Sequence, residues 1–352
     1  MDYHPILKNF NHAITPCIPK DWHHGLLIRG TNWLGDCLMT LPAAWQLRHL
    51  IPKECSISVL TPSFLAPIWK ACTWIDHVIP MRDKHISSEE IKQVQALDCG
   101  IGIVFPNSFG SALDIWKCSI PIRIGRSGNF RSVLLNHRIP KWKHSKESDS
   151  CHQLSYYLEL ISTLGSISLN AQYPPLQVSP NAAKKNNILK KQNVLAIAPG
   201  AAFGPAKQWP TKNYIEVAKY HQKRGGKIVI VGTAKEQAAA KAVQIAIPEA
   251  LDLTGKTNLS ELMSILANTD TVIANDSGAM HLAAALGTPG VAIFGSTDPI
   301  ATGPLGAPWK LLIADTPCRP CFQRICPLQG DKQYHCLHSI TPKQVIAEWE
   351  KI

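Results

Sequence analysis

Short apolar runs that end in a glycine turn and lead into a helical pattern occur in both halves of this chain. The first is Gly25–Arg29, which is followed by Gly30, by a polar turn through Asp36 and by apolar residues at helical spacing from Leu38 to Leu47. A strand, a glycine turn and a helix form the opening unit of an open α/β sheet. We expect further strands at Ser56–Leu60, His77–Pro80 and Cys99–Phe105. Helical stretches separate these strands, so the sheet is expected to be mostly parallel.

A second series of the same kind follows the polar segment Ser179–Gln192, which we interpret as a domain boundary. Its expected strands are Val194–Ala198, Lys227–Val231, one that starts at Asp252, Thr271–Ala274 and Val291–Phe294, and its expected helices are Asn213–Arg224, Ser260–Ala267 and Gly278–Leu286. A chain of 352 residues exceeds what one core usually holds. We therefore predict an α/β protein with two Rossmann-like domains and mostly parallel sheets that face a central cleft.

The predicted domains span residues 25–180 and 193–340. Residues 1–24 are interpreted as an extension or an added strand, and residues 341–352 as an amphipathic helix with Thr341 as its N-cap and Pro342 in its first turn.

The charge balance and the cysteines restrict the setting in which the protein works. Lys and Arg number 36 against 25 Asp and Glu, an excess that suits a polyanionic partner. No apolar run approaches the ~20 residues of a membrane-spanning helix, and Met1–Phe10 lacks the apolar core of a secretory signal. Eleven cysteines, an odd number, indicate mostly reduced and buried thiols. We expect a soluble, cytoplasmic protein.

Three turns qualify as ligand sites, because open α/β sheets bind ligands beyond the carboxyl ends of their strands. Asp36 follows the first turn and is a candidate general base, or a carboxylate that favours the positive end of a helix dipole. Lys207, in the second turn, is a candidate phosphate ligand beside glycine-rich backbone, or a solvated loop lysine.

The third turn contains Asp276, Ser277 and Gly278, with His281 one helical turn further on. Its amides are suited to hold an anion, while capping of the helix by Asp276 or Ser277 and a core role for His281 are the alternatives. No Gly-x-Gly-x-x-Gly with an acid ~20 residues later is present, so dinucleotide binding is not favoured.

Two further segments are rich in groups that bind ions. The stretch 115–146 holds eight basic residues and no acidic one: Lys117, Arg123, Arg126, Arg131, Arg138, Lys141, Lys143 and Lys146. It suits phosphates or anionic lipid, or is ordinary solvated charge; its few aromatic residues argue against nucleic acid. Cys318, Cys321, Cys326 and Cys336, with His335 and His338 nearby, are candidates for a structural zinc site or for reduced structural thiols.

Taken together, the motifs resemble glycosyltransferase family nine, the bacterial heptosyltransferases. The matching stretches run in the family's order over residues 25–350: Arg29–Asp36 with Pro42, Phe105–Leu113, Arg123–Gly125, Leu134–Asn136, Pro199–Ala201, Lys207–Pro210, Asn275–Gly278 with His281, and Phe294–Pro299. The resemblance implies a GT-B architecture, with the acceptor in the N-terminal domain and the nucleotide sugar in the C-terminal one. It also implies inverting, metal-independent transfer of L-glycero-D-manno-heptose from ADP-heptose to the first heptose of the lipopolysaccharide inner core.

Carried over position by position, the resemblance assigns the general base to Asp36 and donor contacts to Lys207, Asp276, Ser277, Gly278 and His281. Glu236 is the candidate for a further donor contact, and Asn32, Arg123 and Arg126 are the candidates for acceptor contacts. The implied partners are ADP-heptose and a lipid A-Kdo-heptose acceptor at the cytoplasmic face of the inner membrane, with peripheral membrane contact, no cofactor and no nucleic acid. A GT-B transferase with another donor or acceptor, or a non-catalytic nucleotide-binding adaptor, is the alternative.

Overall fold

The computed structural model describes residues 3–8, 16–17, 22, 25–141, 151–188 and 192–352. The chain divides into two compact units, Ile6–Pro174 and Pro175–Ile352, and the first residues through Pro5 belong with the second unit. No strand forms in the described part of residues 1–24, so the expected added strand is not found there. In the described residues, no helix is both long and apolar enough to cross a membrane.

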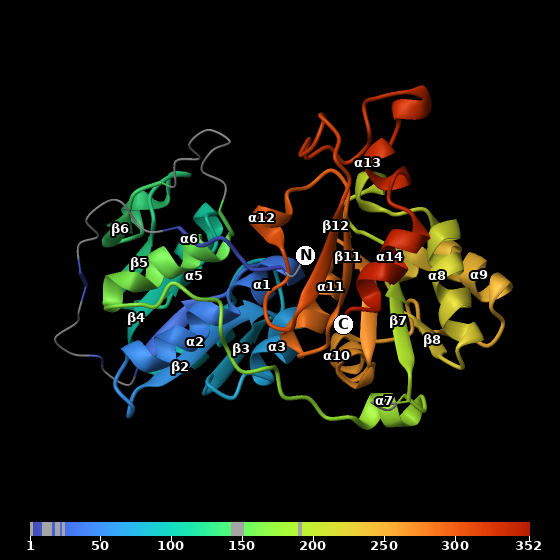
Figure 1. Cartoon of the computed structure of the whole chain (residues 1–352). Coiled ribbons are helices and arrows are strands. Elements are labelled where there is room, and N and C mark those ends of the chain that lie inside the picture. Colours follow the sequence, from blue (N-terminus) through green and yellow to red (C-terminus); the bar gives the residue numbers. More distant parts are fainter. Residues whose placement is uncertain (1–2, 9–15, 18–21, 23–24, 142–150, 189–191) are drawn as a thin grey trace. The chain divides into compact units, whose positions relative to one another are not determined.

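The N-terminal unit is built on a six-stranded parallel sheet in the order β3-β2-β1-β4-β5-β6. Its strands are β1 Gly25–Arg29, β2 Ser56–Pro62, β3 His77–Met81, β4 Cys99–Val104, β5 Ile122–Arg126 and β6 His137–Ile139, and its helices are α1 Leu34–Met39, α2 Leu41–Leu50, α3 Ala66–Lys70, α4 Ser88–Ala96, α5 Phe109–Lys117 and α6 Leu154–Ile161. Figure 1 shows these helices lying along the sheet.

The C-terminal unit repeats this arrangement in the order β12-β11-β10-β7-β8-β9, which is the same sequence of strands counted from its own first one. Its strands are β7 Val194–Ala198, β8 Lys227–Ile230, β9 Leu251–Asp252, β10 Thr271–Asn275, β11 Gly290–Phe294 and β12 Trp309–Ile313, and its helices are α7 Asn181–Lys185, α8 Thr211–Lys223, α9 Gln237–Ala246, α10 Leu259–Asn268, α11 Gly278–Ala285, α12 Pro299–Thr302, α13 His335–His338 and α14 Pro342–Trp349. The prediction of parallel α/β sheets is confirmed in both units.

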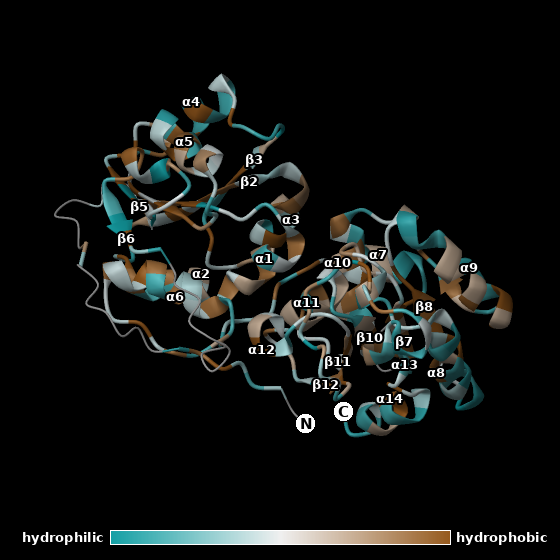
Figure 2. Cartoon of the chain, turned by 90° about the horizontal axis from the view of Figure 1, so that it is seen from above, coloured by the Kyte–Doolittle hydropathy of each residue, from teal (hydrophilic) through white to brown (hydrophobic). Residues whose placement is uncertain are grey.

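The central strands are buried along their whole length, as apolar strands covered on both faces must be. In Figure 2, β2 and β8 are brown, whereas flanking helices such as α8 alternate between brown and teal. The alternation follows from helices that turn one side to the sheet and the other to water.

Three local features differ from or agree with expectation. The helix expected through Leu38 and Leu47 is divided into α1 and α2 at Thr40, because Pro42 lacks an N–H and is accommodated in the first turn of α2. The polar segment 179–192 contains α7, whose Ala183 is fully buried and donates its N–H to Ser264 Oγ at 3.2 Å. Thr341 caps α14 through a capping box with Gln344, as predicted.

Candidate functional site

Both sheets have the strand order of a dinucleotide-binding fold, in which ligands bind where the order reverses, outside the carboxyl ends of the strands. The reversal lies between β1 and β4 in the N-terminal unit and between β7 and β10 in the C-terminal unit. Asp36 follows β1, Lys207 follows β7 and Asp276 follows β10. Each unit therefore carries predicted site residues at its own switch point.

In the C-terminal unit, Lys207 and Asp276 form a close ion pair. Lys207 Nζ lies 2.5 Å from Asp276 Oδ2, and Thr297 Oγ1 donates to the same oxygen at 2.5 Å. The side chain of Lys207 is 14% exposed and that of Asp276 only 3%. The alternative of a freely solvated lysine is thus excluded. Thr297, which lies in the matching stretch Phe294–Pro299 but was not among the predicted site residues, belongs to this group.

Asn275 holds the loop after β7 in place. Its Oδ1 accepts hydrogen bonds from the backbone N–H of Trp209 at 3.0 Å and from the Tyr214 hydroxyl at 2.9 Å. Its Nδ2 donates to the carbonyls of Pro199 at 2.8 Å and Gly200 at 3.1 Å. One buried amide therefore fixes the end of β10 to the loop that carries Lys207.

The start of α11 lies beside this ion pair and has no side-chain cap. Ser277 is the N-cap residue, yet its Oγ is buried without a hydrogen-bond partner, and so is Ser296 Oγ after β11. The alternative in which Asp276 or Ser277 caps the helix through its side chain is therefore wrong, because Asp276 is engaged by Lys207 and Thr297 and the Ser277 hydroxyl makes no hydrogen bond to the helix. A buried hydroxyl without a partner is costly, at about 1–3 kcal/mol, unless a ligand or water satisfies it. The free first-turn amides of the helix add donors suited to an anion.

His281 lies on the first turn of α11 and is buried. Burial lowers the pKa of His281 to about 4; Asp276 opposes this and Lys207 reinforces it. The imidazole is therefore neutral at pH 7, and it lies close enough to Asp276 and Lys207 for both charges to act on it.

Glu236 lies in the turn that follows β8, at the same edge of the sheet. It forms a capping box with Thr233, whose hydroxyl donates to Glu236 Oε2 at 2.7 Å. The Glu236 side chain also packs directly on Gly200, where a Cβ atom would collide with it. The structure thus brings Glu236 to the loop after β7, next to the residues predicted to bind the donor.

In the N-terminal unit, Asp36 lies in the first turn of α1 and is partly buried. Burial raises the pKa of Asp36 above its ordinary value, and a hydrogen bond with Gln153 offsets part of that rise. Gln153 Nε2 also donates to the Tyr157 hydroxyl at 3.0 Å. Asp36 is therefore a carboxylate of increased basicity, as a general base requires.

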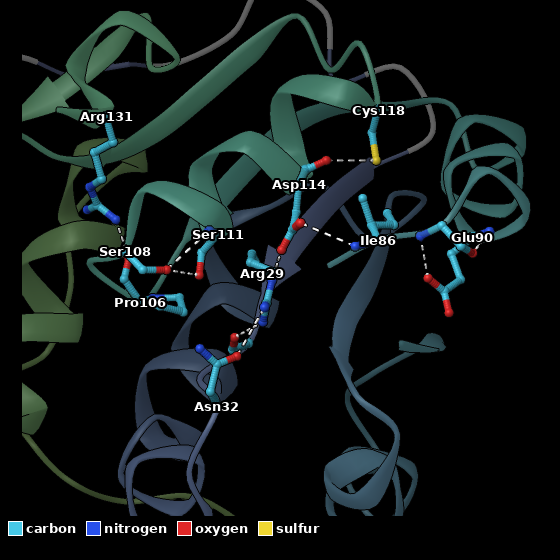
Figure 3. A network of polar contacts seen from close by, with 12 residues as sticks. Arg29, Asn32, Ile86, Glu90, Pro106, Ser108, Ser111, Asp114, Cys118 and Arg131 are labelled. Atoms are coloured by element: carbon cyan, nitrogen blue, oxygen red, sulfur yellow. Dashed lines mark hydrogen bonds and ion pairs between the residues drawn. The ribbon is translucent and has the colours of Figure 1, made fainter. Parts of the chain in front are cut away.

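Asn32 is oriented by a buried arginine at the end of β1. Arg29 Nε donates to Asp114 Oδ2 at 3.0 Å and Arg29 Nη2 donates to Asn32 Oδ1 at 3.0 Å, so the arginine lies between the two residues in Figure 3. Asn32 itself is exposed. Because its oxygen is occupied, its amide NH₂ is the end that remains for a ligand.

The two predicted acceptor arginines have structural partners. Arg126 is buried in an ion pair with Glu159 and donates to the Tyr156 carbonyl at 2.8 Å. Arg123 donates to the carbonyls of Leu134 at 2.8 Å and Ile120 at 2.6 Å. The geometry places both guanidinium groups in the packing of the unit.

The rest of the basic stretch is divided between the interior and the surface. Arg131 is buried, whereas Lys117, Arg138 and Lys141 are exposed. Lys143 and Lys146 lie outside the described residues. The exposed charge of this stretch is therefore smaller than its composition indicates.

The four cysteines of the C-terminal segment lie near one another. Burial raises the pKa of Cys336, Arg319 lowers it, and Cys318, Cys321 and Cys326 raise it further. All are free thiols. Within the described ranges, no three histidine, cysteine or acidic side chains converge in a way that would hold a metal ion.

The segment of these cysteines supports the loop of Lys207. The backbone N–H of Ala206 donates to the Arg324 carbonyl at 3.1 Å, and the Arg324 guanidinium lies over the Phe203 ring. The Arg319 guanidinium donates to the Thr297 carbonyl at 2.8 Å. The cysteine segment therefore contacts both the loop that carries Lys207 and the backbone of Thr297.

The arrangement has counterparts among known proteins. The solved structure of Escherichia coli ADP-heptose lipopolysaccharide heptosyltransferase II matches with a TM-score of 0.76 and 27% identity, over 93% of this chain and 97% of that one. Lipooligosaccharide heptosyltransferase 2 of Campylobacter jejuni is 34% identical over 342 residues, which cover 92% of this chain and 96% of the relative. The corresponding enzyme of Haemophilus influenzae is 30% identical over 297 residues, covering 80% and 86%.

These similarities and the two parallel sheets define the class of protein, which is a glycosyltransferase. The model of glycosyltransferase family 9 (heptosyltransferase) matches residues 90–332, and the chain belongs to that family. The predicted fold class, the family resemblance and the transferase activity are thereby confirmed.

Proposed function

We propose that this heptosyltransferase moves L-glycero-D-manno-heptose from ADP-heptose to the first heptose of the lipopolysaccharide inner core, with inversion and without a metal ion. The relatives named above are called heptosyltransferase 2 or II, and the name of the solved one includes ADP-heptose. By their resemblance to the family, the Asn32–Trp33 turn and the stretch Pro106–Phe109 also favour the second heptose.

One observation carries the donor half of this proposal. An ion-paired lysine, two unpartnered buried hydroxyls and an uncapped helix start meet at the switch point of the C-terminal sheet. Such a set provides a cation and several donors for a diphosphate. We assign Lys207, Ser277 and the amides from Gly278 to the diphosphate, Asp276 to holding Lys207, and neutral His281 and Glu236 to further donor contacts.

The acceptor half rests on Asp36. In the proposed step, Asp36 takes the proton of the acceptor hydroxyl as its oxygen attacks the anomeric carbon from the face opposite the diphosphate. The carbon–oxygen bond to the phosphate breaks, and its electron pair leaves with ADP. Lys207 and the helix amides stabilise the charge that develops on the departing diphosphate, which is the task that a metal ion performs in other transferases.

The acceptor contacts in this proposal come from Asn32, because its amide NH₂ is held outward by Arg29. Arg123 and Arg126 receive no acceptor contact, since both are engaged by backbone carbonyls or by Glu159. The acceptor is anchored in lipid, so we also propose that the enzyme works at the cytoplasmic face of the inner membrane.

The decisive experiment measures ADP release with ADP-heptose, ADP-glucose and UDP-sugars as donors and with one-heptose and heptose-free cores as acceptors. We expect turnover only with ADP-heptose and the one-heptose core, undiminished by a chelator, and the opposite anomeric configuration in the product. Asp36→Asn should lower turnover by about 10²–10⁴-fold with little change in ADP affinity. Transfer with another donor, or normal turnover in Asp36→Asn, would overturn the proposal.

A further inference from the structure

The turn between β5 and β6 exposes two apolar side chains to an unusual degree. Phe130 is 94% exposed and Val133 is 83% exposed, the highest values of any large apolar residue in the part of the chain that the structure describes. Single exposed apolar residues are common, but two on one short turn at this exposure indicate a contact surface.

The turn is held firmly rather than left loose. Arg131, which is buried beneath it, donates to the carbonyls of Arg126, at 2.6 Å, and Pro106, and to Asn107 Oδ1 at 3.1 Å. Asn129 Nδ2 donates to the Asn107 carbonyl at 2.8 Å. Figure 3 shows Arg131 directed towards Pro106. These contacts tie the turn to the loop after β4.

Phe130 adopts a backbone conformation that is unfavourable for an aromatic residue. Its φ is +57°, in the left-handed region where non-glycine residues are uncommon. A non-glycine residue there costs about 1–3 kcal/mol and persists only where its surroundings impose it. The anchored turn therefore presents Phe130 outward, although burying this side chain would be the favourable choice in water.

The surface beside the turn carries positive charge. Arg138 on β6 and Lys141 after it are exposed, and a Cβ atom added at Gly128 would lie 3.9 Å from Lys141 Cδ, so the lysine stem runs along the turn. The sequence from 115 to 146 contains no acidic residue. Apolar side chains flanked by cations match an anionic bilayer, whose headgroups bind the cations while the interface takes up the apolar groups.

We propose that the turn Gly128–Val133 is a membrane-docking element, in which Phe130 and Val133 enter the interface of an anionic bilayer while Arg138 and Lys141 contact lipid phosphates. This proposal rests on the proposed function in one respect: a lipid-anchored acceptor is the reason why docking to a membrane would serve the enzyme. The docking itself is a binding property that needs no turnover.

The first test measures binding of the full chain to vesicles of phosphatidylglycerol and phosphatidylethanolamine by sedimentation. The variant Phe130→Asn/Val133→Thr keeps the fold, because Asn tolerates the left-handed region and Thr has the shape of Val. We expect binding to weaken by at least about 10- to 100-fold, which is the value of withdrawing the Phe130 side chain alone from an apolar phase. Ile245→Thr, which changes a residue that is 73% exposed on α9, is the matched control and should bind like the wild type.

The second test separates the charges from the apolar anchor. Arg138→Gln/Lys141→Gln should weaken vesicle binding by roughly fivefold per charge and reduce its salt dependence. Neutral phosphatidylcholine vesicles should bind the wild type weakly. Wild-type vesicle binding by Phe130→Asn/Val133→Thr would overturn the proposal.

A third test distinguishes docking from the proposed function. The turn variant should lose heptose transfer to a vesicle-embedded acceptor but keep transfer to a deacylated, water-soluble one. Absence of any heptose transfer in the wild type, with vesicle binding lost in the turn variant, would refute the function and leave the docking element. Self-association of the wild type that the turn variant abolishes, with vesicle binding unchanged, would assign the turn to a contact between copies and refute docking.

Discussion

Replacing Lys207 by Met tests whether the lysine serves the donor or only neutralises Asp276. Lys207 Nζ lies 2.5 Å from Asp276 Oδ2, and the Asp276 side chain is only 3% exposed. Lys207→Met therefore leaves a buried carboxylate without its cation. Removing one partner of a buried pair costs about 3–5 kcal/mol. Thr297 still donates to the same oxygen, so we expect the lower end, about 3 kcal/mol, and a fall in Tm of about 6–12 °C.

The double variant Lys207→Met/Asp276→Asn removes both charges and keeps the side-chain volumes nearly constant. Much of the lost stability should return, because no uncompensated charge remains. The affinity for ADP should be about 10- to 150-fold lower than in the wild type in both the single and the double variant, because a hydrogen bond to a charged group contributes about 1.5–3 kcal/mol. Urea unfolding gives the stability and titration calorimetry with ADP gives the affinity.

The two measurements together decide the role of the lysine. Recovery of ADP binding in the double variant, in step with its stability, would show that Lys207 acts only on Asp276 and has no contact with the diphosphate. Unchanged stability in Lys207→Met would refute the energetic argument from the buried pair.

Three further predictions concern other parts of the molecule. The pKa of His281 is about 4 in the folded chain and 6.5 in the unfolded chain, so the unfolded chain binds more protons between these pH values. We therefore expect the free energy of unfolding to fall by up to about 3 kcal/mol as the pH drops from 6.5 to 4. Urea unfolding at each pH measures this fall, which should be shallower in His281→Gln. Asp114→Ala leaves buried Arg29 unpaired and should cost about 3–5 kcal/mol, whereas a loss below about 1 kcal/mol in the same assay would contradict the pairing as a source of stability. Gly200→Ala displaces the Glu236 side chain and should weaken ADP binding with the fold retained; unaltered affinity in calorimetry would remove Glu236 from the donor site.

The sequence was sufficient for the central strands and for the turns that follow them. Runs such as Val194–Ala198 are apolar, short and followed by glycine, so their period and their place in the sheet follow from local composition. The strands β5, β6 and β12 were not predicted; β6 and β12 lie at the edges of their sheets, and β5 lies between β4 and β6. They contain charged residues or have few residues, and only their pairing with a neighbouring strand makes them strands.

The parts of the site that were not predicted depend on partners far along the chain. Asn275 and Thr297 gain their roles from Trp209 and Asp276, which tertiary structure alone brings close. Arg126 looked like exposed charge because its own segment has no acidic residue, yet its counter-ion is Glu159 on α6. Local sequence indicates which residues are polar, whereas burial and partners decide whether a polar group binds a ligand or holds the fold.

The repetition of one strand order in both units has a consequence for how such an enzyme can diversify. Each half is a complete module whose binding loops come from its own reversal of strand order. Under the proposed division of roles, substitutions in the loops after β1 and β4 would change the choice of acceptor, while the loops after β7 and β10, which we assign to the nucleotide sugar, would stay as they are. A chimera that takes Ile6–Pro174 from a relative of different acceptor preference is the natural way to engineer new core structures from one activated sugar.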